Sequence, residues 1–220
     1  MIQSETLAFI KDISENNDRE WFAAHRDRYE SAREDVLLLI EKLIPELART
    51  DPQFPIDTPA KKCLMRIYRD VRFSKNKDPY KNNFGVSFNV KGKGIPTPEY
   101  YLHIQPGKNF FGVGFWMPES PVLKNIREEI DYNASEFLDI VNAEAFKKLF
   151  KLSEEDKLKN MPKGYPIDHP QIEFLKLKSF IAIMPLKDEE LLKPQIVDKL
   201  KNAFESIQPF VLFLRNAVSQ

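Results

Sequence analysis

Hydrophobic residues near the two ends of the chain recur every three or four positions, which is the period of an amphipathic α-helix. Near the N-terminus this pattern predicts a short helix over residues 4–13 and a longer helix after the sequence NNDREWF. Asn17 and Glu20 have the spacing of a capping box, which predicts that the longer helix begins there. Pro45 lacks the amide that a helix interior needs, so we expect a stop or a kink at that position.

The second half of the chain is also predicted to be mainly helical. One helix is expected to begin at Pro118–Glu119, and Ser153 with Asp156 has the spacing of another helix start. The last residues are predicted to form two closing helices over 188–208 and 209–218.

In the middle of the chain the hydrophobic period changes to two, which is typical of β-strands. Strands are predicted over 63–73, 85–90, 100–105 and 109–117, and a final one over 180–184. Consecutive strands with short connections favour antiparallel pairing. We therefore expect an α+β fold, in which an antiparallel sheet of four to five strands has helices from both chain ends packed on one face.

The two faces of the predicted sheet differ in chemistry. The apolar face is expected to hold Met65, Ile67, Val86, Phe88, Val90, Leu102, Ile104, Phe111, Val113 and Phe115. The other face is expected to hold Arg66, Tyr68, Asp70, Ser87, Asn89, Tyr101, His103 and Gln105, together with Gly112 and Gly114. Glycine weakens a strand interior, so we expect something to approach the backbone at these two glycines.

Length and composition indicate one globular domain over residues 1–220, with 42% hydrophobic residues and a formal net charge of zero. A neutral chain is not typical of a protein that coats polyanions. No apolar run is long enough for a membrane span and no signal peptide is recognisable, so we expect a cytoplasmic protein without membrane contact. The single cysteine, Cys63, excludes an intrachain disulfide and is predicted to be a buried thiol, and His25 is predicted to be packed and hydrogen-bonded.

Basic residues concentrate in the stretch KKCLMRIYRDVRFSKNKDPYKNNFG, residues 61–85, where Asp70 and Asp78 are the only acids. The stretch contains Lys61, Lys62, Arg66, Arg69, Arg72, Lys75, Lys77 and Lys81. Because like charges repel, these residues need an anionic ligand or carboxylate partners. Acids of nearby helices are the structural alternative: Asp27, Glu30, Glu34, Glu128 and Glu129.

Candidate ligand-binding residues follow from this stretch and from the polar face of the sheet, because guanidinium groups match phosphate and carboxylate geometry. They are Arg66, Arg69, Asp70, Arg72, Lys75, Tyr80, Lys81 and His103. Asp70, Tyr80, His103 and His169 are of the types that act as general acids or bases. No spacing among them indicates a metal site, no cofactor motif is present, and no catalytic residue is assigned.

Three segments together resemble a known family. NNDREWF, CLMRIYRDVRFSKNKDPYKNNFG and PKGYPIDHP, in this order, are similar to a group of bacterial and fungal proteins catalogued only as a conserved domain of unknown function. The resemblance implies one cytoplasmic domain of about this length without an established activity. In the family pattern an acid commonly stands at position 76 and a threonine at 78, where this chain has Asn76 and Asp78.

Two functions fit these observations. The first is a domain that binds, or acts on, a small phosphorylated or carboxylated compound on the polar face of the sheet. The second is an interaction module that binds nucleic acid or an acidic protein partner through the basic loop, residues 72–81. A deep pocket would favour the first and a flat basic surface the second, whereas the sequence does not indicate an oligomeric state.

Overall fold

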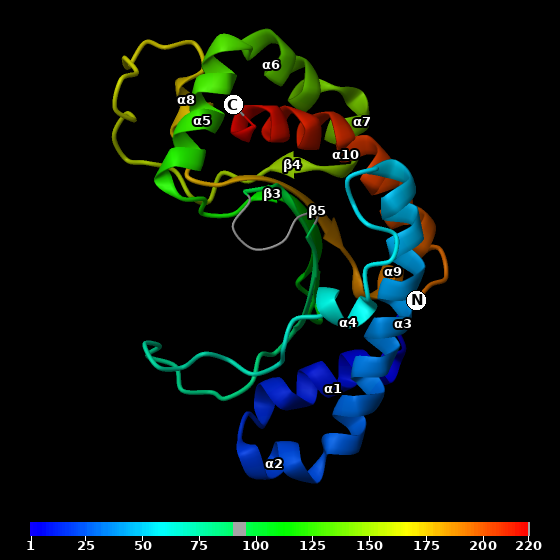
Figure 1. Cartoon of the computed structure of the whole chain (residues 1–220). Helices are drawn as coiled ribbons and strands as arrows, with labels where there is room; N and C mark the ends of the chain where they lie inside the picture. The colour runs from blue at the N-terminus through cyan, green and yellow to red at the C-terminus, as the bar shows by residue number, and fades with distance from the viewer. Residues whose placement is uncertain (90–95, 220) are drawn as a thin grey trace. The chain divides into compact units, whose positions relative to one another are not determined.

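The computed structural model describes residues 1–89 and 96–219 and shows an α+β fold (Figure 1). Its five strands form one antiparallel sheet, as the sequence predicts. In sheet order they are β1 (Phe84–Phe88), β2 (Glu99–Ile104), β3 (Asn109–Phe115), β5 (Phe180–Leu186) and β4 (Lys151–Leu152).

The helices precede and follow the first three strands. They are α1 (Ser4–Glu15), α2 (Arg19–Ala24), α3 (Arg26–Thr50), α4 (Ala60–Cys63), α5 (Ser120–Tyr132), α6 (Ala134–Asn142), α7 (Glu144–Leu149), α8 (Ile172–Leu175), α9 (Asp188–Leu191) and α10 (Ile196–Val218). None of the described helices is both long and apolar enough to cross a membrane.

The chain divides into two compact units. Unit 1 comprises Met1–Phe88, Tyr101–Phe111 and Pro185–Asn202, and unit 2 comprises Asn89–Tyr100, Gly112–Met184 and Ala203–Gln220. Strands β2, β3 and β5 and helix α10 each contribute residues to both units.

Aromatic contacts show how a helix packs on the sheet within each unit. In unit 1, Tyr29 of α3 stacks on Phe84 of β1 with ring centroids 6.3 Å apart. In unit 2, Phe204 of α10 meets Tyr100 of β2 edge-on at 6.0 Å. Ring pairs of this kind stabilise a core beyond the area they bury, and the predicted α+β class with one antiparallel sheet is confirmed.

Strand β2 shows the two faces most clearly, because its even-numbered residues are buried and Tyr101 and His103 are only half-buried. The predicted apolar face is confirmed in its buried members: Ile67, Val86, Phe88, Leu102, Ile104, Phe111, Val113 and Phe115. Met65 is the exception, with 44% of its surface exposed. Val90 lies outside the described residues.

The predicted strand over 63–73 is wrong. Helix α4 runs through Cys63. In the described part of the chain, residues 64–73 then make two isolated bridges, Leu64 with Val86 and Tyr68 with Tyr80. Four residue steps separate positions 64 and 68, whereas six separate 80 and 86. The two extra residues on the returning side form a bulge, which interrupts the regular alternation and exposes Met65.

The predicted capping box at Asn17 is also wrong, because Asp18 is the N-cap of α2 and accepts a hydrogen bond from the Trp21 amide. The long helix is divided at His25, which ends α2 and precedes α3. As predicted, His25 is packed and hydrogen-bonded: its ring stacks on Trp21 at 4.2 Å, and Nδ1 lies 2.8 Å from the Trp21 carbonyl oxygen.

Two prolines lie inside helices that continue past them. Helix α3 runs beyond Pro45 to Thr50, so of the predicted stop or kink at Pro45 the stop does not occur. Helix α10 runs through Pro209 as one helix, so the predicted separate helix over 209–218 is wrong. An internal proline costs about 3 kcal/mol. Burial of the flanking apolar residues, such as Leu47 after Pro45, offsets this cost.

Residues 153–156 do not begin a helix. They follow β4, and the Asp156 carbonyl accepts a hydrogen bond from the Lys178 amide at 2.7 Å. The expectation of a close approach at Gly114 holds, but the approaching group is β5. A Cβ atom on Gly114 would overlap the Phe180 carbonyl oxygen and lie 2.9 Å from its carbonyl carbon.

Candidate functional site

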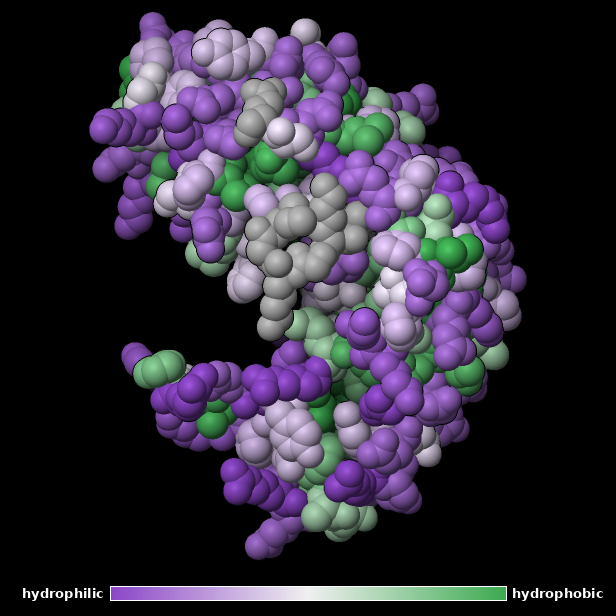
Figure 2. Space-filling model, viewed as in Figure 1, coloured by the Kyte–Doolittle hydropathy of each residue, from purple (hydrophilic) through white to green (hydrophobic). Residues whose placement is uncertain are grey.

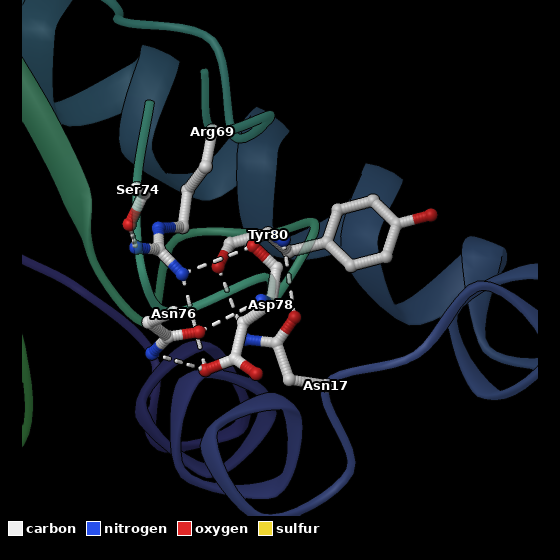
Figure 3. Close-up of polar contacts among 6 residues, drawn as sticks. All are labelled: Asn17, Arg69, Ser74, Asn76, Asp78 and Tyr80. Atoms are coloured by element: carbon white, nitrogen blue, oxygen red, sulfur yellow. Dashed lines mark hydrogen bonds and ion pairs between the residues drawn. The ribbon is translucent and has the colours of Figure 1, made fainter. Parts of the chain in front are cut away.

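The basic loop is held in shape by Arg69. One guanidinium nitrogen donates to the Asp78 carbonyl oxygen at 3.0 Å, another donates to the Ser74 hydroxyl at 3.4 Å, and the Asp78 carboxylate lies 3.9 Å away (Figure 3). Asn76 accepts from the Asp78 amide and donates to its carboxylate, both at 2.8 Å. Arg69 and Asp78 therefore build the loop and satisfy each other.

Tyr80 belongs to the core of unit 1. Its ring is 5% exposed and stacks on Phe22 with centroids 4.1 Å apart, and burial raises the pKa of its hydroxyl. The Asn17 side chain binds the Tyr80 backbone twice, donating to the carbonyl and accepting from the amide, both at 3.0 Å (Figure 3). The ring points away from the polar cluster around Asp78 in this view.

Arg72 pairs with Asp70 at the surface. Its Nε donates to one carboxylate oxygen at 3.0 Å and its Nη2 to the other at 2.7 Å. These hydrogen bonds raise the pKa of Arg72 and lower that of Asp70. Both Arg69 and Arg72 thus pair with carboxylates of the basic stretch itself. The acids of neighbouring helices, the structural alternative to a ligand, are not their partners among the described residues.

The tip of the basic loop is exposed and carries both hydrophilic and hydrophobic residues (Figure 2). Lys75 is exposed, and Lys77 donates to the Val71 carbonyl oxygen at 2.9 Å. Phe73 is 94% exposed, with the Arg72 guanidinium 5.9 Å from its ring centre. The tip therefore exposes one aromatic ring to solvent near two lysine side chains.

Arg66 and Lys81 differ from the other candidates. Among residues 1–89 and 96–219, neither side chain takes part in a hydrogen bond or an ion pair. The Arg66 charge helps to lower the pKa of Asp70, but Arg72 already binds that carboxylate. Lys81 is half-buried, and its pKa is lowered by burial and then by the nearby Arg66 charge.

Backbone hydrogen bonds fix the positions of these two cations. The Met65 amide donates to the Gly85 carbonyl at 2.9 Å, and the Lys81 amide donates to the Ile67 carbonyl at 2.7 Å. Arg66 lies between these two bonds, and Lys81 begins the bulge that follows Tyr80. Bulges commonly re-aim a side chain next to a functional site.

Three side chains of the polar face form a hydrogen-bonded chain beside Lys81. The Tyr101 hydroxyl lies 3.0 Å from His103 Nδ1, and His103 Nε2 lies 2.9 Å from the Gln105 side-chain oxygen. Since that oxygen accepts, Nε2 carries the proton and Nδ1 accepts from Tyr101. Burial lowers the pKa of His103, the Gln105 hydrogen bond raises it, and the Lys81 charge lowers it.

The same face provides space for Tyr101. A Cβ on Gly85 would lie 2.8 Å from the Tyr101 hydroxyl oxygen and 3.0 Å from the Met65 sulfur, so a side chain at position 85 would displace these two groups. His103 also stacks on Phe110 with centroids 4.9 Å apart. The imidazole is therefore held by Tyr101, Gln105 and Phe110, and burial together with the Lys81 charge favours its neutral form by lowering its pKa.

His169, a candidate acid or base, lies in unit 2 and has a local role. Its Nε2 is 2.8 Å from the Asp131 carboxylate, and its Nδ1 accepts from the Gln171 amide at 3.1 Å. Both ring nitrogens are engaged, so His169 ties the loop over 161–170 to α5. The described residues contain no group of three or more His, Cys, Asp or Glu side chains placed to hold a metal ion.

A hollow of about 640 Å³ lies among α6, α7 and α10 of unit 2. Ile140, Phe146 and Leu212 line it, with Glu136 and Asp139 as its acids. None of the candidate residues contributes to it. The candidate residues thus lie outside this hollow, in unit 1.

The comparisons with known proteins identify a family. A protein-family model described as conserved hypothetical protein, DUF2461, matches residues 5–213. The chain belongs to this family. Searches of curated proteins and of solved structures give no match. The DUF2461 description assigns no activity, and the matched region contains Arg66, Lys81 and the whole polar face.

Sequence reasoning found part of this site. Arg66, Lys81 and His103 were candidates, and Tyr101 and Gln105 were placed on the correct face but were not proposed as site residues. Their spacing from His103, two positions on each side, is the signal that would have found them, because alternate residues of a strand share a face. Asp131 could not be paired with His169 from the sequence, since 38 positions separate them.

Proposed function

We propose that this DUF2461 protein binds a small phosphate- or carboxylate-bearing compound on the polar face of the sheet, with Arg66 and Lys81 holding the anion. The observation that carries the proposal is the half-buried Lys81, whose side chain has no carboxylate partner in the described part of the chain. The cytoplasmic location expected from the sequence stays a prediction.

Burial without a counter-ion makes this lysine costly, because a desolvated charge is unfavourable until it is paired. Arg66 adds repulsion from the same side. A bound anion would remove both penalties, and the Arg66 guanidinium offers two parallel donors to phosphate or carboxylate oxygens. The Tyr101 hydroxyl and the His103 ring provide polar groups on the same face.

The other five candidates have supporting roles in this proposal. Arg69 and Tyr80 shape the loop and the core, Asp70 and Arg72 neutralise each other, and Lys75 is a solvated surface charge. Exposed charges of that kind contribute about 0–1 kcal/mol. The ligand contacts are therefore expected from Arg66 and Lys81.

The test is a thermal-shift screen of inorganic phosphate, phosphorylated metabolites and carboxylates, followed by calorimetric titration of the best compound. Lys81→Met and Arg66→Gln should each weaken binding about 10- to 100-fold, since a hydrogen bond to a charged group is worth about 1.5–3 kcal/mol. Arg72→Gln is the matched control, because that arginine already has a carboxylate partner. Equal losses in all three variants, or no stabilising compound at all, would contradict the proposal.

A second function, an interaction module for nucleic acid or an acidic protein, is favoured by one observation, the 94% exposed Phe73 on the basic loop. Phe73→Ser should weaken binding of a single-stranded oligonucleotide by about 1–3 kcal/mol if bases stack on the ring. Fluorescence anisotropy with labelled oligonucleotides and acidic peptides measures this, with Arg66→Gln as the control. Binding that is unchanged by Phe73→Ser would exclude the stacking contact.

A further inference from the structure

We propose that the hollow among α6, α7 and α10 binds a small organic cation, an amine with an apolar body. The residues that line it all belong to unit 2, so the inference does not depend on the anion site proposed in unit 1. The volume of the hollow, about 640 Å³, lies within the range of about 300–1,000 Å³ that small-molecule sites occupy.

Two helices form the walls of the hollow, and the third contributes its floor. Residues three or four positions apart share one face of a helix, and both walls follow this spacing. Helix α6 contributes positions 136, 139, 140 and 143, and α10 contributes positions 206, 209 and 212. Figure 1 shows α6 and α7 next to α10.

The floor is a packed aromatic cluster. Phe146 of α7 is 3% exposed, and its ring centre lies 5.8 Å from those of Phe150 and Phe210. Above this floor, Leu212 is 50% exposed and Ile140 is half-buried. The hydrocarbon part of a ligand would cover this apolar surface and remove it from water, which is favourable.

The charge of the hollow selects the polar part of the ligand. Glu136 and Asp139 are the only charged side chains among the described residues that line it. In the described part of the chain, neither carboxylate takes part in a side-chain hydrogen bond or an ion pair. A cationic group therefore finds two acceptors here that no lysine or arginine already occupies.

The position of Asp139 is unfavourable for its own helix. It stands in the last turn of α6 (Ala134–Asn142), where the negative end of the helix dipole disfavours an acid. Glu136 places a like charge three positions away, which is also destabilising. An ammonium or guanidinium group beside the two carboxylates would remove both penalties.

The size of the hollow favours a small ligand over a protein partner. Ten described residues line it, whereas a stable protein interface uses about 20–30 residues on each side. Sites between packed helices are also common places for small molecules. The ligand is therefore expected to place its cation at α6 and its apolar body against Leu212 and Phe146.

The probe is 2-phenylethylamine, which joins an ammonium group to an apolar ring. 2-Phenylethanol is its uncharged counterpart, and ethylamine lacks the ring. The intact protein, with ¹³C-labelled isoleucine and leucine methyl groups, is titrated with each compound and observed by NMR. We expect 2-phenylethylamine to shift the methyl signals of Ile140 and Leu212 with a dissociation constant of about 1 mM, and the other two compounds to bind at least about fivefold more weakly.

Variants separate the charge from the apolar contact. Asp139→Asn and Glu136→Gln keep the shape of the side chain and remove one charge, so each should weaken binding of the amine about three- to fivefold and leave that of the alcohol unchanged. Leu212→Ser should weaken binding of both compounds. Glu144→Gln is the matched control, because Glu144 is an exposed acid of α7 that does not line the hollow, and it should change binding by less than about twofold.

Equal affinity of the amine and the alcohol would overturn the proposal, since the hollow would then not recognise a cation. Equal losses in Asp139→Asn and Glu144→Gln would overturn it in favour of a diffuse negative surface, and unchanged methyl signals at about 10 mM amine would refute binding outright. A basic amphipathic peptide that shifts these signals while the amine does not would assign the hollow to a peptide partner instead. Signals of Leu212 that depend on protein concentration without any ligand, again with no response to the amine, would assign it to a second copy of the chain.

Discussion

At the scale of single residues, Asn17 takes the place of a strand partner for Tyr80. Its amide group accepts from the Tyr80 N–H and donates to the Tyr80 carbonyl, so both backbone groups are satisfied by one side chain. The contact joins the start of α2 to the end of the basic loop, 63 positions later. It therefore anchors the segment that carries Lys81.

Asn17→Ala should lower the free energy of unfolding by about 1–3 kcal/mol, because it leaves two partly buried backbone groups without partners. Asn16→Ala is the matched control. Asn16 makes one exposed bond to the Asp12 carbonyl, so its loss should cost less than about 1 kcal/mol. Urea unfolding of both variants measures this, and equal costs would show that the Asn17 contact contributes nothing special.

Cys63 is a second residue with a measurable consequence. Burial raises the pKa of its thiol from 9.0 to about 11, so above pH 9 the unfolded chain ionises while the folded chain does not. The unfolded state then binds fewer protons, and stability should fall as pH rises between those two values, by up to about 3 kcal/mol.

Urea unfolding of wild type and Cys63→Ala, compared at several pH values across this interval, tests the Cys63 contribution. The wild type should lose more stability than the variant over the same pH range. Tyrosine ionisation affects both proteins alike and cancels in the comparison. Parallel pH profiles would mean that the thiol ionises equally in the folded and unfolded states.

The position of a side chain in the fold could be predicted from the sequence more readily than its bonding partner. The pattern placed His103 on the polar face and predicted the packed His25, because each depends on neighbours within a few positions. It could not show that Arg72 binds Asp70 while Arg66 binds no acid among the described residues. Arg66 stands four positions from Asp70 and Arg72 two, so an alternating strand would place both arginines on the same side as Asp70. Distance in the folded chain decides that difference.

At the scale of elements, the pairing of β3 with β5 depends on Gly114. Its φ of 140° is rarely adopted by other residues, and β5 occupies the space where a side chain would begin. Gly114→Ala should destabilise the protein by more than about 4 kcal/mol or prevent folding, because backbone atoms of Phe180 cannot move aside cheaply.

Gly107→Ala is the control for Gly114→Ala. Gly107 also has a positive φ, 72°, but nothing lies within 4 Å of its added Cβ. Its substitution should cost about 1–2 kcal/mol, the strain of the left-handed conformation alone. Soluble yield, circular dichroism and urea unfolding compare the two variants, and similar costs would mean that β5 gives way at Gly114.

The elements with regular periods were predictable and the interrupted ones were not. Alternation over 100–105 and 109–117 corresponds to β2 and β3 because those strands pair on both sides. The run over 63–73 alternates equally well, but the bulge after Tyr80 prevents continuous pairing there. The alternation in residues 63–73 gives no information on the segment that pairs with them. That segment, between positions 80 and 86, has two more residues than the stretch from 64 to 68.

At the scale of the whole molecule, the question is whether the two units unfold together. Strands β2, β3 and β5 and helix α10 each belong to both, so neither unit is complete without elements that run into the other. We expect one cooperative transition, in line with the single domain predicted from length.

Pulsed hydrogen exchange across a urea series tests this cooperativity. Amides of α3, in unit 1, and of α6, in unit 2, should lose protection at the same urea concentration. In a Trp116→Phe variant, Trp21, half-buried in unit 1, provides an independent fluorescence signal for the first unit. Loss of protection in α6 at clearly lower urea would show two domains that unfold separately.

The backbone hydrogen bonds at the base of the basic loop allow residues to be inserted into the loop. The Arg69 amide donates to the Pro79 carbonyl at 2.9 Å, and the Lys81 amide donates to the Ile67 carbonyl. Arg66 and Lys81 therefore lie outside the loop that the first of these bonds closes. Lengthening a surface loop costs little, because closure entropy grows slowly with length. Extra residues after the exposed Lys75, whether acquired in evolution or inserted as an epitope tag, would leave the spacing of the two cations intact.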